Sequence, residues 1–227
     1  MLTAKNNVFE PSDSLRFFLL ASDTPSIFSL GGDLRYFAQL VETQDKNRLE
    51  IYARKAMNLL WSILNGLHKD LITLAVVHGK CFGGGFETIL ACDYIIAEES
   101  ALFSFPEIGL GIFPGMGGAS LLSQITTRKD YSNLLTSSNV FSSRQLHDMG
   151  LVDLVVDDGD CPAAVTSVLK KMNSAYISHK ALFELRKKPI LNRYEEFAHM
   201  VDVWINAVLK IDKRRLSIIK RIAEISL

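Results

Sequence analysis

Three consecutive glycines, at positions 83–85, constrain this chain more than any other feature of its sequence. They lie between residues 71–77, an apolar run typical of a buried strand, and residues 86–91, which can form the first turns of a helix. Glycine permits unusual backbone angles and lets a ligand approach the main chain closely. Because the start of a helix also presents unpaired N–H groups, this junction suits a ligand on which negative charge develops. A tight turn without any ligand would have the same sequence, and the glycine patterns of phosphate-binding loops are absent.

Two glutamates stand alone among apolar, glycine and proline residues. Glu87 lies two residues past the last glycine, and Glu107 follows an apolar run at residues 101–105. Burial disfavours the charged form of a carboxyl group and raises its pKa, as a general acid or base working near neutral pH requires. The same sequence would result if Glu87 were a first-turn glutamate favoured by the helix dipole, or if both were unrelated surface glutamates. An acid/base pair is therefore one of two open interpretations.

A second glycine turn, Gly31-Gly32, precedes Asp33, which is suited to cap the next helix. As structure, this is an ordinary turn. As function, the Gly32 N–H group could join the Gly84 N–H group in polarising a carbonyl group. Removal of one such donor typically slows a reaction by about 10²–10³-fold.

Short apolar runs alternate with helical patterns along the first two thirds of the chain, and helical patterns continue to its end. We predict strands at residues 15–21, 71–77, 93–97, 101–105 and 151–156. We predict helices at residues 45–67, 86–91, 119–125, 143–149, 163–172, 178–187, 194–209 and 213–225. The expected fold class is α/β, with a core at residues 1–160 and a helical region at 161–227 in the same functional unit.

Composition excludes several function classes. Lysine plus arginine and aspartate plus glutamate both number 25, so no net charge attracts nucleic acid or an anionic membrane over a distance. Neither a signal core nor an apolar run of about 18 residues is present, and we expect a cytoplasmic protein. Cys81, Cys92 and Cys161 lack CxxC spacing, so we expect reduced core thiols and no metal site.

Four motifs occur in order: GGD at 31–33, GGGFE at 83–87, PEIGLGIFPGMGG at 106–118 and MGLVDLVV at 149–156. This series closely resembles the crotonase (enoyl-CoA hydratase) superfamily, over about residues 15–156. The resemblance implies a crotonase-type spiral of ββα units, with some N-terminal strands missing because only 31 residues precede Gly32. It also implies an oxyanion hole made by the N–H groups of Gly32 and Gly84, with Glu87 and Glu107 as acid and base.

The resemblance further implies where and how the substrate is held. The additional substrate-binding positions are Leu30, Gly31, Gly83, Gly85, Gly111 and Trp204. For Trp204, a plain helix-packing stripe is the alternative interpretation. No cofactor is implied beyond the coenzyme A or acyl carrier protein phosphopantetheine that carries the acyl thioester. A homo-oligomer, a trimer or a hexamer, is implied, although a monomer is the alternative.

Within the superfamily, LGGDL, GGGFE, FPGMG, MGLVD and the C-terminal helix with Trp204 are most similar to synthases of diffusible signal factors, which act in quorum sensing. Those enzymes dehydrate a 3-hydroxyacyl chain on acyl carrier protein to a cis-2-enoyl product and can hydrolyse the thioester. Two alternatives stay open. One is a generic enoyl-CoA hydratase or isomerase, and the other is a non-catalytic crotonase-like scaffold.

Overall fold

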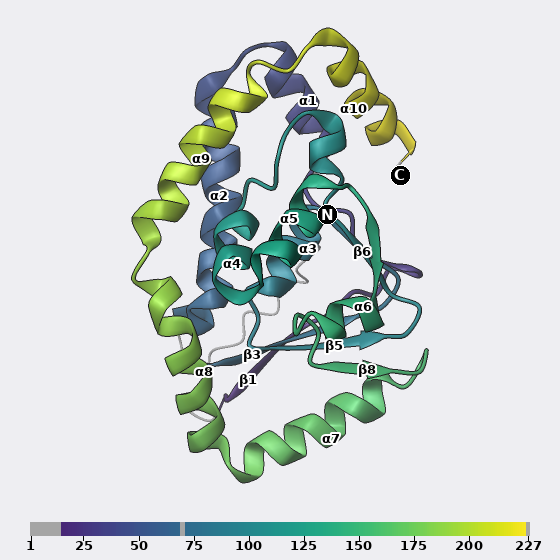
Figure 1. Ribbon diagram of the computed structural model, residues 1–227, viewed down its shortest axis with the longest axis vertical. Helices are drawn as coiled ribbons and strands as arrows, with labels where there is room; N and C mark the ends of the chain where they lie inside the picture. The colour runs from purple at the N-terminus through teal and green to yellow at the C-terminus, as the bar shows by residue number, and fades with distance from the viewer. Residues whose placement is uncertain (1–14, 69–70, 226–227) are drawn as a thin grey trace.

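The first six strands of the chain enter two sheets alternately (Figure 1). The computed structural model describes residues 15–68 and 71–225, and within these ranges eight strands form two four-stranded sheets. The first sheet is parallel and contains, in spatial order, β1 (Phe17–Leu20), β3 (Ile72–Val77), β5 (Tyr94–Glu98) and β8 (Leu154–Val156). The second contains β2 (Ile27–Ser29), β4 (Lys80–Phe82), β6 (Leu102–Ser104) and β7 (Val140–Ser142), with β7 antiparallel to β6.

The chain repeats one unit, in which a strand of the first sheet is followed by a strand of the second and then by helix. The helices that complete these units are α1 (Leu34–Glu42), α2 (Lys46–Leu64), α3 (Gly84–Leu90), α4 (Gly118–Ile125) and α5 (Arg128–Thr136). Short 3-10 turns, η1 (Gly66–His68) and η2 (Pro106–Leu110), lie between them. This repetition of ββα units confirms the predicted fold class.

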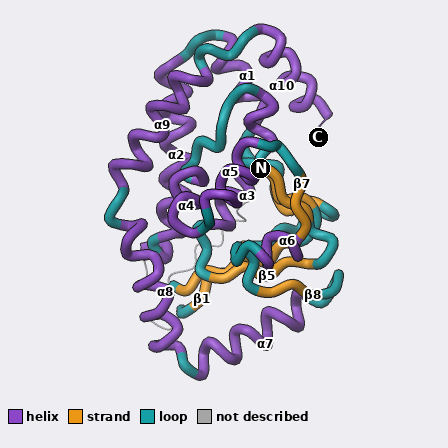
Figure 2. The backbone as a smooth tube through the Cα atoms, viewed as in Figure 1, coloured by secondary structure: helices purple, strands orange, loops and turns teal. Residues whose placement is uncertain are grey.

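The second part of the chain is helical. After α6 (Ser143–Asp148) and β8 it forms α7 (Cys161–Ser174), α8 (Tyr176–Leu191), α9 (Tyr194–Val208) and α10 (Lys213–Ile225). Helix α7 packs on the first sheet, and α9 runs beside α2 (Figure 2). The four long helical patterns of the sequence are therefore confirmed, with boundaries that differ by a few residues.

Side chains at the helix starts account for where several helices begin. Asp33 accepts hydrogen bonds from the main-chain N–H groups of Arg35 and Tyr36, which confirms it as the cap of α1. Ser142 and Gln145 form a reciprocal capping box at the start of α6. These bonds satisfy donors that have no partner within the helix.

Several predictions of local structure need correction. The strand expected at 15–21 is shorter than predicted and lies at the edge of the first sheet, where Leu19 is 39% exposed. Among the strands of residues 15–68 and 71–225, β3 is its one neighbour, so only part of its surface is covered. The strands β4 and β7 and the helix α5 were missed. Three-residue strands are too short to show a period, and α5 is too polar to show an apolar face.

A buried ion pair joins the helical region to the first sheet. Lys187 of α8 places its Nζ atom 2.7 Å from Oδ1 of Asp93, and both side chains are less than a tenth exposed. The other oxygen of Asp93 accepts hydrogen bonds from the N–H and hydroxyl groups of Thr73. Oδ1 lies outside hydrogen-bond geometry, but opposite charges at this distance attract at any angle. Lys187 therefore supplies the counter-charge for the buried carboxylate of Asp93.

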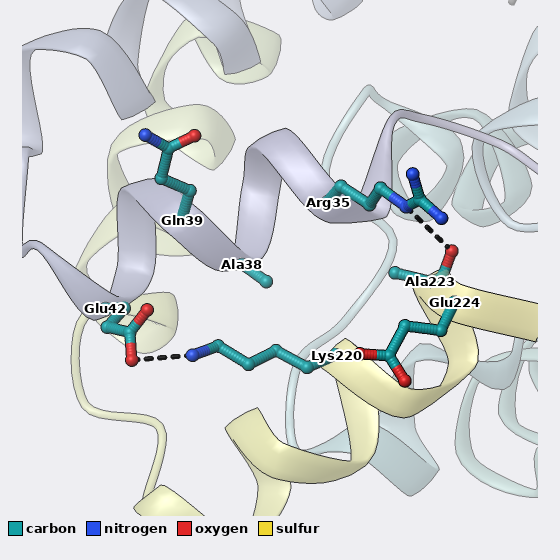
Figure 3. Close-up of a pocket in the computed structure, with 7 residues that line it drawn as sticks. All are labelled: Arg35, Ala38, Gln39, Glu42, Lys220, Ala223 and Glu224. Carbon is teal, nitrogen blue, oxygen red and sulfur yellow. Dashed lines mark hydrogen bonds and ion pairs between the residues drawn. The ribbon is translucent and has the colours of Figure 1, made fainter.

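The C-terminal helix α10 packs against α1 through polar contacts around a hollow of about 400 Å³ (Figure 3). Nζ of Lys220 lies 2.6 Å from Oε1 of Glu42. Nε–H of Arg35 donates to the main-chain carbonyl of Ala223 over 3.2 Å. The charged groups here largely satisfy one another, which indicates a contact between helices rather than a ligand site.

Candidate active site

The three-glycine turn passes from β4 into α3 and lies against two other segments. Gly83 has φ +55°, a conformation that favours glycine. A β-carbon on Gly83 would lie 2.9 Å from Oε1 of Glu107, and one on Gly85 would lie 2.5 Å from the side chain of Ser29. Glycine is therefore required both by the backbone angle at Gly83 and by close approach at both positions.

Glu87 occupies the first turn of α3 and is 1% exposed. Its Oε1 atom accepts hydrogen bonds from the main-chain N–H groups of Met116, over 2.9 Å, and Gly118, over 2.8 Å. Burial raises the pKa of Glu87 to about 7, and the main-chain donors oppose this rise because they stabilise the carboxylate. Glu87 is thus a buried carboxyl group that can change protonation near neutral pH.

Glu107 lies in η2, and its side chain reaches back to the glycine turn. Its Oε2 atom is buried, and no donor of the described residues reaches it. Burial, together with the charge of Glu87, raises the pKa of Glu107 to about 8. An unpaired buried carboxylate is costly, so the neutral acid is favoured at Glu107. The two glutamates that stood 20 residues apart in the sequence are therefore electrostatically coupled.

The two glycine turns lie side by side. A β-carbon on Gly31 would be 3.0 Å from the main-chain nitrogen of Gly84. One on Gly84 would be 3.8 Å from the nitrogen of Gly32. The structure thus brings together Gly32 and Gly84, as predicted, while binding of a carbonyl oxygen between their N–H groups stays a prediction.

Two residues beside these turns were missed by the sequence analysis. The thioether sulfur of Met116 lies 2.7 Å from the position of a Gly84 β-carbon, and the Tyr52 hydroxyl oxygen lies 2.0 Å from that of Gly32. Met116 is in the loop before α4, and Tyr52 is in the middle of α2. Met116 lies in the motif at 106–118 but received no role of its own, and Tyr52 has no local sequence signal, because only the path of the chain brings both residues to the glycine turns.

The remaining predicted positions divide into two groups. The first group, Leu30, Gly31, Gly83 and Gly85, surrounds the junction of the two turns. Trp204 is instead 7% exposed, and its Nε1–H group donates to the carbonyl of Phe113 over 2.9 Å. Gly111, the other member of the second group, lies against the side chain of Arg215. The burial of Trp204 and its hydrogen bond to Phe113 favour the interpretation that it packs α9 against the core.

Other expectations concern cysteines, membranes and metals. Cys81, Cys92 and Cys161 are free and buried, which confirms them as core thiols. In the part of the chain that the structure describes, no helix is long and apolar enough to cross a membrane. Across residues 15–68 and 71–225, no group of three or more His, Cys, Asp and Glu residues is arranged to hold a metal ion.

The raised pKa values predict how stability depends on pH. Since Glu87 and Glu107 have pKa values of about 7 and about 8 in place of 4.5, the folded protein binds more protons than the unfolded chain between about pH 5 and pH 8. We therefore expect the free energy of unfolding to fall as pH rises through this window, by up to about 1.4 kcal/mol per pH unit for each group. Urea unfolding at pH 5.5 and pH 8.5 measures the change.

The double variant Glu87→Gln, Glu107→Gln is the matched comparison for this pH prediction, since it keeps two side chains of similar size and removes both titrations. Its free energy of unfolding should change much less over the same pH range. An equal loss of stability in wild type and variant would contradict the assignment of buried, protonated carboxyl groups.

Known proteins resemble this chain in sequence. A family model described as enoyl-CoA hydratase/isomerase matches residues 2–200. A probable mitochondrial enoyl-CoA hydratase of Arabidopsis thaliana is 29% identical over 176 residues, which cover 76% of this chain and 56% of that protein. The matched stretch therefore spans little more than half the length of this curated relative.

Solved structures share the fold. An enoyl-CoA hydratase from Bacillus halodurans superposes with a TM-score of 0.75 at 25% identity, covering 91% of this chain and 82% of that one. DspI of Pseudomonas aeruginosa superposes with a TM-score of 0.70 at 25% identity, covering 84% of this chain and 72% of that one.

Proposed function

Since the chain belongs to the enoyl-CoA hydratase/isomerase family, we propose that it hydrates a 2-enoyl thioester or, in reverse, dehydrates a 3-hydroxyacyl thioester. The observation that carries this proposal is the pair formed by the buried Glu87 and the partly buried Glu107, both with raised pKa values, beside the paired turns of Gly32 and Gly84. Two carboxyl groups in different protonation states can move two protons in one reaction. The flanking N–H groups supply the donors that a developing oxyanion needs.

The order of the two pKa values supports a division of roles. Main-chain donors favour the ionised form of Glu87, whereas Oε2 of Glu107 has no donor among the described residues. In the hydration direction Glu87 accepts a proton from water as the oxygen attacks C3 of the enoyl chain. Glu107 then donates its proton to C2, and the charge that develops on the thioester oxygen is held by Gly32 and Gly84. Dehydration reverses these steps.

A narrower second candidate is conversion of a 3-hydroxyacyl thioester to a cis-2-enoyl signal fatty acid, with hydrolysis of the thioester. The motif resemblance to synthases of diffusible signal factors supports it, together with the structural likeness to DspI. The carrier is coenzyme A in the first candidate and acyl carrier protein in the second. A homo-oligomer in the cytoplasm is part of the proposal, with a monomer as the alternative for the signal synthase.

Turnover of defined thioesters tests both candidates. Purified protein is incubated with 2-enoyl and 3-hydroxyacyl chains on coenzyme A and on acyl carrier protein, and the products are measured by mass spectrometry. We expect gain or loss of one water, with the carrier that reacts faster identifying the substrate class. A cis double bond and a free fatty acid would favour the signal synthase.

The non-catalytic scaffold is the outcome that would overturn the proposal. In that case the folded protein would turn over none of these thioesters on either carrier. Circular dichroism of the same preparation establishes that it is folded.

A further inference from the structure

The hydroxyl group of Tyr52 lies directly against the Gly31-Gly32 turn. A β-carbon on Gly32 would be 2.0 Å from the Tyr52 hydroxyl oxygen and 3.3 Å from its Cζ atom. Tyr52 belongs to α2, so it reaches this turn from a different element. The absence of a side chain at position 32 is therefore what makes room for the phenol group.

Aromatic contacts hold the Tyr52 ring in place. The ring meets Tyr36 edge to face, with centroids 5.9 Å apart, and it lies 6.5 Å from the ring of Phe37. Both partners belong to α1, the helix that begins immediately after Gly32 and Asp33. The phenol group and the glycine turn are thus positioned by the same pair of helices, and the hydroxyl needs little reorganisation to act at the turn.

The Tyr52 hydroxyl is available as a donor. No side-chain or main-chain group of the described residues forms a hydrogen bond with it. Burial and the charge of Asp33 raise its pKa to about 12, so it keeps its proton at any physiological pH. A half-buried hydroxyl without a protein partner favours a hydrogen bond to a ligand or to water.

We propose that the Tyr52 hydroxyl donates a hydrogen bond to the thioester carbonyl oxygen, as a third donor beside the N–H groups of Gly32 and Gly84. The three groups meet at Gly32, because its nitrogen lies 3.8 Å from the position of a Gly84 β-carbon and its own β-carbon position lies 2.0 Å from the Tyr52 hydroxyl oxygen. This inference rests on the proposed function, since it requires an acyl-thioester substrate. It assigns a role to a side chain in α2, a helix without any of the predicted site residues.

Tyr52→Phe tests this role by removing a single oxygen atom. We expect kcat/KM to fall by roughly 10–10²-fold, mainly through kcat, because the bond strengthens as charge develops on the oxygen. Tyr36→Phe is the matched control, since it removes a hydroxyl from the neighbouring ring of the same aromatic contact and should leave kcat/KM unchanged. Thermal unfolding of both variants checks that their packing is retained.

A spectroscopic measurement separates a donor from a residue that only supports the turn. The infrared stretching frequency of a ¹³C-labelled carbonyl in a bound saturated acyl thioester should be lowered by the wild-type protein and less so by Tyr52→Phe. Equal kcat/KM and an equal carbonyl frequency in Tyr52→Phe and wild type would overturn the donor role and leave the proposed function intact. If the wild type turned over no thioester, the proposed function would be wrong. If the wild type also left the carbonyl frequency of the bound thioester unshifted, the donor role of Tyr52 would be wrong as well.

Discussion

Replacement of Glu87 or Glu107 by glutamine should lower kcat/KM for hydration by about 10²–10⁴-fold, the range that one positioned acid or base contributes. The amide keeps the size of the side chain, and its oxygen can still accept the hydrogen bonds of Met116 and Gly118 at position 87. What it loses is the ability to exchange a proton. The fold should survive, because a buried neutral amide avoids the cost of burying a charge. Steady-state rates with the preferred thioester measure the effect.

Glu195→Gln is the control for these two variants. Glu195 also lies in the first turn of a helix, but on the exposed surface of α9. Its substitution should leave kcat/KM unchanged. If Glu87→Gln and Glu107→Gln were as active as Glu195→Gln, the two buried glutamates would be structural, and the acid/base proposal would be wrong.

Replacement of Lys187 by methionine should destabilise the protein by about 3–5 kcal/mol, because it leaves the Asp93 carboxylate buried without a counter-charge. In a chain of this size that corresponds to a fall in Tm of roughly 2–4 °C for each kcal/mol. Chemical unfolding followed by circular dichroism gives the free energy directly. The large effect is expected because the ion pair connects α8 to the first sheet and both of its side chains are less than a tenth exposed.

Two further variants make this stability prediction specific. Lys188→Met changes the next residue, whose side chain is exposed, and should alter the free energy of unfolding by less than about 0.5 kcal/mol. Adding Asp93→Asn to Lys187→Met should recover part of the lost stability, because the amide oxygen can still accept from Thr73 and no charge remains. A Lys187→Met protein as stable as Lys188→Met would show that the ion pair contributes nothing net.

The active-site proposal depends on more than the two carboxyl groups. Met116 contributes through both of its parts: its N–H group binds Glu87, and its sulfur lies over Gly84. One residue thus connects Glu87 to the three-glycine turn. Any movement of the loop before α4 therefore affects both parts of the site together.

The sequence by itself determined the class of fold and identified the two glutamates on which the proposed chemistry rests. Residues 71–77 and the glycines at 83–85 predicted the strand and the turn that carry Glu87, because apolar runs and glycine act on the backbone locally. The lone carboxyl groups of Glu87 and Glu107 were recognisable because charged residues are rare in apolar loops. The α/β class and the long C-terminal helices followed from patterns contained in short stretches of chain, whereas the ββα spiral was implied by the resemblance of the four motifs.

Tertiary structure alone decided which distant groups meet. It placed Tyr52 against Gly32, the N–H group of Met116 on Glu87, and Lys187 on Asp93, pairs separated by 20, 29 and 94 positions in the numbering. It also decided the edge position of β1 and the three-residue strands β4 and β7. The physical reason is that periodicity and backbone preference act over one or two turns of chain, whereas these contacts depend on how the whole spiral closes.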